Sequence, residues 1–254
     1  MTDHDLLELA FGLATQAGDA ILAVRSRGFE TMHKADASVV TEADHAAEAI
    51  ILAALRAATP DIPVVAEEEM AAGHIPRSAG TFWLVDPLDG TREFVALRDD
   101  FAVCIGLVRA GRPVLGVVAA PAHREAFGGI VGQGATRRDD SGVHSIRVRM
   151  PPAAGLTVIA SRSSGRHPRM ASFLEGRSVA ETLQVGSAIK FCRIAEGVAD
   201  LYPRFGRTME WDTAAAQAVL EAAGGTVRCA DTGATLTYGK PGFENPHFVA
   251  EGAA

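Results

Sequence analysis

Cysteine and blocks of basic residues are scarce in this chain of 254 residues. Its three cysteines, Cys104, Cys192 and Cys229, lie far apart in apolar surroundings and form no CxxC pair. That spacing argues against a disulfide framework or a zinc site and favours reduced thiols in a cytoplasmic protein. The formal net charge is −7, and no basic run offsets it. This charge argues against a nucleic-acid polymer as the main partner, and an anionic substrate would need local positive charge from lysine, arginine or metal ions.

Signals for export and for membrane insertion are missing as well. The N-terminal stretch MTDHDLLELA carries acids where a signal peptide carries basic residues. No apolar run approaches the roughly 18 residues that a membrane span requires. We therefore expect a soluble, cytoplasmic protein.

Helical and strand-like patterns alternate along the chain, which predicts a mixed α/β fold class. Helices are expected at residues 5–25, 42–58, 187–196 and 213–223, and strands at 63–66, 82–85, 101–108, 113–119, 157–160 and 201–202. The stretch from Gly132 to Gly155 is rich in Gly, Arg and Asp. It is the expected crossing between an N-terminal half, residues 1–150, and a C-terminal half, residues 151–254.

The segment WLVDPLDGT places two aspartates three positions apart at the end of an expected strand. Pro87 fixes φ near about −65°, and Gly90 can adopt backbone angles that other residues avoid. Such a turn can direct the carboxylates of Asp86 and Asp89 and the carbonyl of Leu88 at one small volume. These are hard oxygen ligands of the kind that Mg²⁺ prefers. With Asp86 bridging, two ions about 3.5–4 Å apart become possible, which is the spacing of two-metal phosphoryl-transfer sites.

The end of the same segment has two interpretations. If a helix begins near Thr91, the free amides of Gly90 and Thr91 would face a phosphate. An ordinary Asp-Pro turn followed by a threonine-capped helix explains most of these residues without any ligand. Taken alone, the segment leaves both interpretations open.

Three other acids each have a candidate role and an ordinary alternative. Glu67 follows an apolar strand, where functional side chains collect in α/β folds, although acidic runs are usually solvated. Asp212 begins the alanine-rich helix and would serve equally as an N-cap. Asp44 ends a Thr-x-x-Asp sequence, which fits a capping box.

Together these four segments resemble the magnesium-dependent, lithium-sensitive phosphatase superfamily of inositol monophosphatase and fructose-1,6-bisphosphatase, and within it the CysQ-type 3'(2'),5'-bisphosphate nucleotidases. The resemblance runs from about residue 5 to about residue 250 and includes WLVDPLDGTREF, EWDTAAAQAVLEAAGG, GSAIKFC and YPRFG. It implies a layered α/β/α/β/α architecture, with the site between an α+β N-terminal half and an α/β C-terminal half.

The resemblance also implies a set of metal ligands. One Mg²⁺ would be held by Glu67, Asp86 and the carbonyl of Leu88, and a second by Asp86, Asp89 and Asp212. The aligned glutamate in the family is the first after the strand, so Glu67 is preferred to Glu68. Lithium is expected to inhibit, as it does in the family.

Catalytic and substrate-binding roles follow in the same way. Thr91 and Asp44 resemble the pair that orients and deprotonates the attacking water, with Glu67 as the third catalytic residue. Lys190, Arg204 and Ser161 lie in segments that resemble those binding the nucleotide, although a lysine or arginine at a helix end is often only a surface charge. The full expected substrate site also includes ligand residues and the turn: Glu67, Leu88, Asp89, Gly90, Thr91, Ser161, Lys190, Arg204 and Asp212.

The chain departs from the family pattern at three places. Val39 replaces the proline of a Ser-Pro-Val-Thr loop, Ala66 replaces a Ser or Gly before the paired glutamates, and Ser164 stands where a histidine is common. None of these changes removes an expected metal ligand. They bear on recognition of the base rather than on the chemistry.

The expected activity is hydrolysis of the 3'-phosphate of adenosine 3',5'-bisphosphate by direct attack of water, giving AMP and phosphate. No P-loop GxxxxGK[ST] and no GxSxG elbow occurs that would indicate another mechanism. The alternatives are the same chemistry on inositol phosphate, fructose bisphosphate or histidinol phosphate, and a catalytically silent ligand-binding relative. A homodimer and peripheral contact with the inner face of the membrane stay open.

Overall fold

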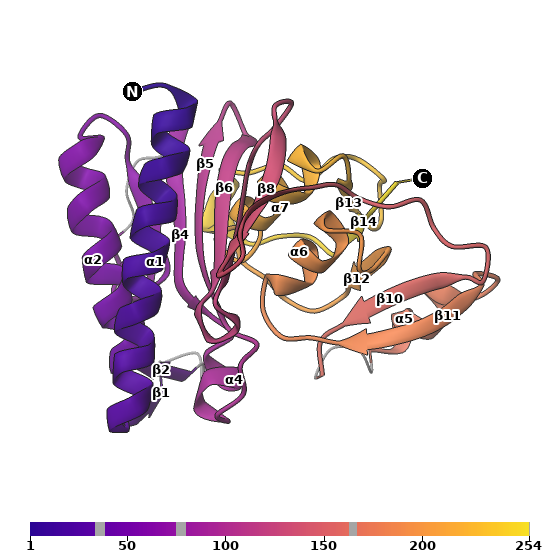
Figure 1. Ribbon diagram of the computed structural model, residues 1–254, viewed down its shortest axis with the longest axis horizontal. Helices are drawn as coiled ribbons and strands as arrows, with labels where there is room; N and C mark the ends of the chain where they lie inside the picture. Colours follow the sequence, from indigo (N-terminus) through magenta and orange to yellow (C-terminus); the bar gives the residue numbers. More distant parts are fainter. Residues whose placement is uncertain (34–38, 75–79, 163–166, 254) are drawn as a thin grey trace.

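Secondary structure is stacked in five layers (Figure 1). The computed structural model describes residues 1–33, 39–74, 80–162 and 167–253. The layers are α1 and α2, a seven-stranded sheet, α6 and α7, a five-stranded sheet, and α5. The expected α/β class and the layered α/β/α/β/α architecture are therefore confirmed.

The helices have the following bounds. They are α1 (Asp3–Arg27), α2 (Glu42–Ala58), α3 (Glu67–Ala71), α4 (Thr91–Val95), α5 (Pro168–Leu174), α6 (Ile189–Ala195) and α7 (Ala214–Ala222), with short 3-10 turns at Pro121–His123 and Pro241–Phe243. The helices α1, α2 and α7 were all expected, and α1 was expected from the spacing of its apolar residues. Among the described residues, α1 alone has the length and composition of a membrane-crossing helix, which corrects the expectation that no such stretch exists. Ten of its 25 residues are buried in this fold, against α2 and the first sheet.

The first sheet has the order β3-β4-β5-β6-β7-β8-β9. Its strands are β3 (Val64–Ala66), β4 (Thr81–Asp89), β5 (Ala102–Arg109), β6 (Arg112–Ala120), β7 (Glu125–Ile130), β8 (Gly134–Asp139) and β9 (Gly142–Ile146). Only β3 and β4 are parallel, and the other neighbours are antiparallel. Alternate side chains of β5 point to opposite faces: Val103 and Ile105 face α1 and α2, and Cys104 faces α6 and α7.

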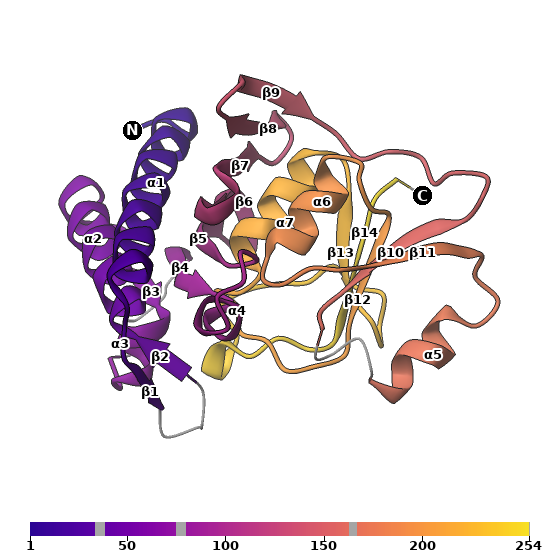
Figure 2. The ribbon, with the colours of Figure 1, turned by 60° about the horizontal axis from the view of Figure 1, so that its bottom comes forward.

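The second sheet has the order β11-β10-β12-β14-β13. Its strands are β10 (Leu156–Ala160), β11 (Val179–Gln184), β12 (Leu201–Arg204), β13 (Thr226–Cys229) and β14 (Phe248–Glu251). One face shares a core with α6, α7 and the first sheet, and the other packs on Phe173 and Leu174 of α5 (Figure 2). A small antiparallel pair, β1 (Thr31–His33) and β2 (Val39–Thr41), precedes α2.

The predicted crossing between the halves is wrong in its first part. Residues 134–146 form the hairpin of β8 and β9, which extends the first sheet. Most side chains of β9 are exposed, so the strand lacks the apolar alternation by which strands are recognised. The exposed edge strand β11 was not expected for the same reason. The division of the chain near residue 150 stays a prediction.

Helix α7 lies unusually close to the first sheet, because two glycines face each other beneath it. Gly106 of β5 pairs with Gly116 of β6. A Cβ added at Gly116 would lie 2.3 Å from the carbonyl oxygen of Ala215, and one at Gly106 would lie 2.7 Å from its nitrogen. Since Asp212 precedes this helix, the close packing also determines where that acid lies.

Replacing Gly116 by alanine tests this packing. We expect Gly116→Ala to lower the free energy of unfolding by about 3 kcal/mol, because backbone rather than a flexible side chain blocks the new methyl group. Urea denaturation measures the change. Gly12→Ala is the matched control: nothing lies within 4 Å of a Cβ there, and this exposed position in α1 should gain up to about 1 kcal/mol. Equal stability of the two variants would contradict the close approach.

Candidate active site

A bulge at the end of β4 turns the DPLDGT segment away from the sheet. Asp86 pairs with Cys104 and Asp89 with Ala102, so β4 has one extra residue in this interval. The bulge accommodates Pro87, whose nitrogen has no hydrogen to donate to a ladder. Gly90 then adopts a φ of 93°, and α4 begins at the next residue. The expected turn and the helix start at Thr91 are confirmed.

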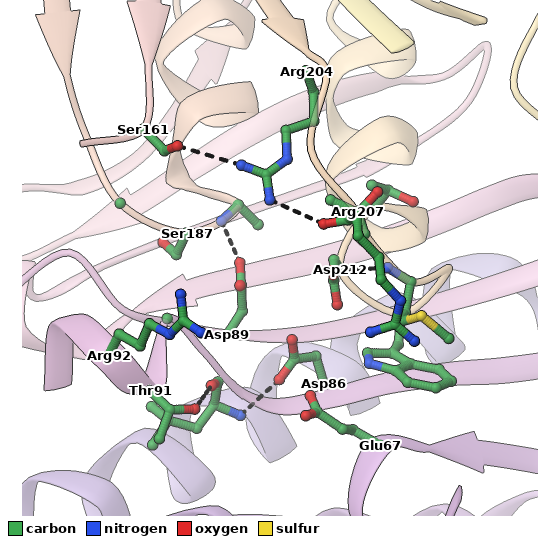
Figure 3. Close-up of a pocket in the computed structure, with 18 of the residues that line it drawn as sticks. Glu67, Asp86, Asp89, Thr91, Arg92, Ser161, Ser187, Arg204, Arg207 and Asp212 are labelled. Carbon is green, nitrogen blue, oxygen red and sulfur yellow. Dashed lines mark hydrogen bonds between the residues drawn. The ribbon is translucent and has the colours of Figure 1, made fainter. Parts of the chain in front are cut away.

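Four acids from three distant segments face one cavity (Figure 3). Oxygen atoms of Glu67, Asp86 and Asp212 all lie within 4.8 Å of one another. Asp89 lines the same cavity, and its carboxylate accepts the backbone N–H of Ala188. Glu67 therefore lies with the other acids, whereas Glu68, which is buried, is not a member of this group.

Burial and mutual repulsion perturb these acids. Asp86 is 2% exposed, and burial together with the negative charges of Glu67, Asp89 and Asp212 raises its pKa well above the usual range. Burial and the charges of Asp89 and Glu67 do the same to the pKa of Asp212. Burial also raises the pKa of Asp89, although the positive charge of Lys190 opposes the shift.

This donor set fits a hard divalent cation. Oxygens of three carboxylates lie close together, and Leu88 lines the same cavity. Carboxylate and carbonyl oxygens are the ligands that Mg²⁺ prefers. A cation here would also supply the positive charge whose lack raises the pKa of the acids.

Asp44 and Thr91 form a hydrogen-bonded pair at the edge of the acid group. The hydroxyl of Thr91 lies 3.1 Å from a carboxylate oxygen of Asp44 and 3.1 Å from the carbonyl oxygen of Leu88. The other carboxylate oxygen of Asp44 accepts the N–H and the hydroxyl of Thr41, at 2.7 and 2.8 Å. The capping box exists, and the same carboxylate contacts Thr91. Burial raises the pKa of Asp44, and the charge of Glu67 adds to the shift.

The cavity has a volume of about 780 Å³, and cations line it together with the acids. Arg204 donates to the hydroxyl of Ser161 at 3.3 Å and to the carbonyl of Arg207 at 3.1 Å. Lys190 is 4% exposed, donates to the carbonyl of Ser187 and lies 5.1 Å from the centre of the Tyr202 ring. Burial lowers the pKa of Lys190 to about 8.

The structure brings all the candidate residues to this cavity except Asp44, which reaches it through Thr91. Two arginines that line the cavity, Arg92 and Arg207, were not singled out beforehand. Their signal was proximity in sequence: Arg92 directly follows the DPLDGT segment, and Arg207 lies three residues after Arg204. Ser164, which departs from the family pattern, lies outside the described residues.

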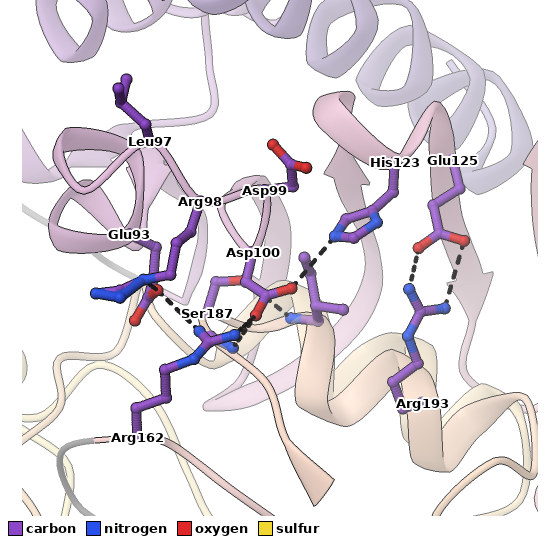
Figure 4. A network of polar contacts seen from close by, with 12 residues as sticks. Glu93, Leu97, Arg98, Asp99, Asp100, His123, Glu125, Arg162, Ser187 and Arg193 are labelled. Carbon is purple, nitrogen blue, oxygen red and sulfur yellow. Dashed lines mark hydrogen bonds and ion pairs between the residues drawn. The ribbon is translucent and has the colours of Figure 1, made fainter.

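A cluster of polar contacts beside the cavity links the loop before β5 to the loops after β10 and β11 (Figure 4). Asp100, between α4 and β5, accepts from Arg162 at 2.6 Å and from the N–H of Gly186 at 3.1 Å, and His123 Nε2 lies 3.3 Å away. Arg162 also donates to Glu93 at 2.8 Å. We call these five residues the Asp100 cluster.

The Asp100 cluster fixes the wall of the cavity that contacts Asp89. Gly186 has no room for a side chain, since a Cβ there would lie 2.5 Å from the carbonyl oxygen of Asp100. The next residue, Ser187, has a φ of 49°, and the one after it, Ala188, donates its N–H to Asp89. Asp100 therefore holds one end of the segment 186–188, and the other end of this segment donates a hydrogen bond to Asp89.

The pairing of His123 with Asp100 makes part of the stability depend on pH. The hydrogen bond to Asp100, helped by the charge of Glu125 and opposed by burial and Arg193, raises the pKa of His123 above 6.5. A raised histidine pKa contributes stability that is complete below about pH 6.5 and is lost as pH rises through the folded-state value. We expect His123→Gln to remove about 0.5 kcal/mol of this pH dependence between pH 6 and 8, a small effect because the pair is partly solvated. Urea unfolding at several pH values measures it, and parallel curves for the two proteins would contradict the pairing.

Known proteins match this chain over nearly its whole length. The model of the inositol monophosphatase family matches residues 2–252. The 3'(2'),5'-bisphosphate nucleotidase CysQ of Salmonella typhimurium is 41% identical over 246 residues, which are 96% of this chain and 98% of the relative. The crystal structure of CysQ from Bacteroides thetaiotaomicron has a TM-score of 0.80 at 34% identity, covering 98% of this chain and 97% of that one. An inositol monophosphatase from Anabaena has a TM-score of 0.77 at 27% identity, covering 98% and 90%.

The family model and the relatives cover both sheets and all four acidic segments. The resemblance inferred from those segments is confirmed. This chain belongs to the inositol monophosphatase family.

Proposed function

We propose that this chain is a 3'(2'),5'-bisphosphate nucleotidase, a Mg²⁺-dependent phosphomonoesterase that converts adenosine 3',5'-bisphosphate to AMP and phosphate. The observation that carries the proposal is the 41% identity, across almost the whole of both chains, to a relative with that name. The cavity supports it independently, because acids that suit a cation face arginine and lysine side chains that suit phosphate.

The acid group is the proposed metal site. Glu67, Asp86 and the Leu88 carbonyl would hold one Mg²⁺, and Asp86, Asp89 and Asp212 a second. When bound, the ions supply charge neutralisation of the phosphate, activation of water and stabilisation of the departing oxygen. The repulsion among the acids supports this assignment, since it raises the pKa of Asp86 and Asp212 when no cation is present. Inhibition by Li⁺ is part of the proposal.

Thr91 and Asp44 are the proposed residues that prepare the attacking water. The Thr91 hydroxyl would orient the water, and Asp44 would receive the proton through it. The 3.1 Å contact between the two side chains provides the path. Burial raises the pKa of Asp44, which makes its carboxylate a stronger base than an exposed aspartate. Glu67, whose negative charge acts on Asp44, completes the proposed catalytic group.

Lys190 and Arg204 are the proposed holders of the second phosphate. Both cations line the cavity, and Arg204 lies on the side away from Glu67 and Asp86 (Figure 3). Ser161, whose hydroxyl accepts from Arg204, would contact the same part of the nucleotide. Gly90 and Thr91 would face the phosphate that is removed. A monoester with one phosphate would leave Lys190 and Arg204 without their anionic partner.

The free cysteines support a cytoplasmic location for the protein. Cys104 and Cys192 are free and buried, which suits a reducing environment. We therefore assign the enzyme to the cytoplasm.

Phosphate release from purified protein tests the activity. With Mg²⁺ present, kcat/KM for adenosine 3',5'-bisphosphate should exceed that for inositol 1-phosphate by at least about tenfold, because charged hydrogen bonds to the second phosphate are lost in the smaller substrate. Removing Mg²⁺ with a chelator should abolish release, and Li⁺ should inhibit it. Faster turnover of inositol 1-phosphate, fructose 1,6-bisphosphate or histidinol phosphate would contradict the assigned substrate while retaining the chemistry.

The variant Asp89→Asn tests the two-metal arrangement in the same assay. It removes one charge with little change of shape, and we expect kcat to fall by at least about 100-fold. Asp99→Asn is the matched control, because Asp99 is 59% exposed and pairs with Arg25 outside the cavity. Full activity of Asp89→Asn would show that this acid holds no essential cation.

A further inference from the structure

Glu48 is a buried acid for which the proposed reaction has no use. It lies on α2, one helical turn after Asp44, and is 5% exposed. Burial and the negative charges of Glu69 and Glu67 raise the pKa of Glu48 to about 7. A carboxylate is costly at such a position unless hydrogen bonds compensate its burial.

The carboxylate of Glu48 binds the start of α3. One oxygen accepts the N–H of Glu68 at 2.8 Å, and the other accepts the N–H of Glu69 at 3.1 Å. These are two of the amides at a helix N-terminus that have no partner within the helix. The residue before α3 is Ala66, which makes no side-chain cap. An N-cap residue accepts such N–H groups with its own side chain, directly before the helix. Glu48 accepts them from a neighbouring helix instead.

Helix α3 depends on such help because it is very short. It spans Glu67–Ala71, and a helix of this length is unstable in isolation. Its first residue is Glu67, one of the three acids whose oxygens lie within 4.8 Å of one another. A second contact from α2 reaches the same helix, since Arg56 donates to Glu69 at 2.6 Å.

Helix α2 thus supports both sides of the acid group. Asp44 and Glu48 are four residues apart, so their side chains leave the same face of the helix. Asp44 contacts Thr91 at one side, and Glu48 holds the backbone that carries Glu67 at the other.

We infer that Glu48 is a positioning residue, which sets the place of the metal ligand Glu67 by capping α3 from the neighbouring helix. This inference rests on the proposed metal site. It assigns to Glu48 no contact with the substrate or the cation. Partners that orient a metal ligand through a hydrogen bond affect metal affinity by about 10- to 100-fold.

Two measurements on the full chain test the inference. Isothermal titration with Mg²⁺ alone gives the dissociation constant, and hydrogen exchange of the metal-free protein gives the protection of the Glu68 and Glu69 amides. Glu48→Gln keeps the shape but leaves only one acceptor oxygen, and we expect it to raise the Mg²⁺ dissociation constant by about tenfold. Glu48→Ala should raise it further and speed exchange of both amides by at least about tenfold.

Two control variants separate positioning from general stability. Glu42→Gln removes a half-exposed acid of the same helix, and Ile51→Val removes one methyl group from its buried face. Both should leave the Mg²⁺ dissociation constant within about twofold, even where Ile51→Val lowers the melting temperature. Wild-type Mg²⁺ affinity in both Glu48 variants would overturn the inference, as would an equal loss in Ile51→Val.

A failure of the proposed function gives a different result. If the wild-type protein binds no Mg²⁺, the metal site is wrong, and the exchange measurement alone decides the role of Glu48. Faster exchange at Glu68 and Glu69 in Glu48→Gln then still supports the cap, and unchanged exchange overturns it.

Discussion

Repulsion among buried carboxylates is the constraint on which this structure depends. Asp86 is buried and Asp212 is partly buried, Glu67 and Asp89 lie beside them, and burial together with these negative charges raises the pKa of both. Such an arrangement costs stability unless protons or a cation compensate it. A divalent ion bound among these oxygen ligands would offset the repulsion, and the positive charge of the ion would then attract a phosphate.

The rest of the fold holds these acids in place against that repulsion. A bulge in β4 accompanies the turn that carries Asp86 and Asp89 to the cavity, and paired glycines under α7 bring Asp212 close to the first sheet. Glu48 holds the start of α3, and the Asp100 cluster holds the loop whose amide contacts Asp89. Each acid is thus fixed by a backbone feature or by a charged partner from another segment, so that rigidity is built in before any ligand binds.

Much of the site could be predicted from local sequence because its motifs are compact. Asp86, Leu88 and Asp89 lie within one turn, and the alanine-rich helix after Asp212 has a clear apolar period. The supports could not be predicted, because their partners are distant: Glu48 binds an amide 20 residues away and Asp100 one 86 residues away. The exposed strands β9 and β11 were missed because polar edge strands lack an alternation of apolar and polar residues. Helix α1 was expected because its apolar residues recur at three- and four-residue steps.

Anomalous diffraction from a crystal soaked in Mn²⁺, which takes the same oxygen ligands as Mg²⁺, tests the central claim most directly. We predict two anomalous peaks about 3.5–4 Å apart. One should lie among Glu67, Asp86 and the Leu88 carbonyl, and the other among Asp86, Asp89 and Asp212. A crystal that shows no anomalous peak among these four acids, or whose acids point to separate places, would contradict it.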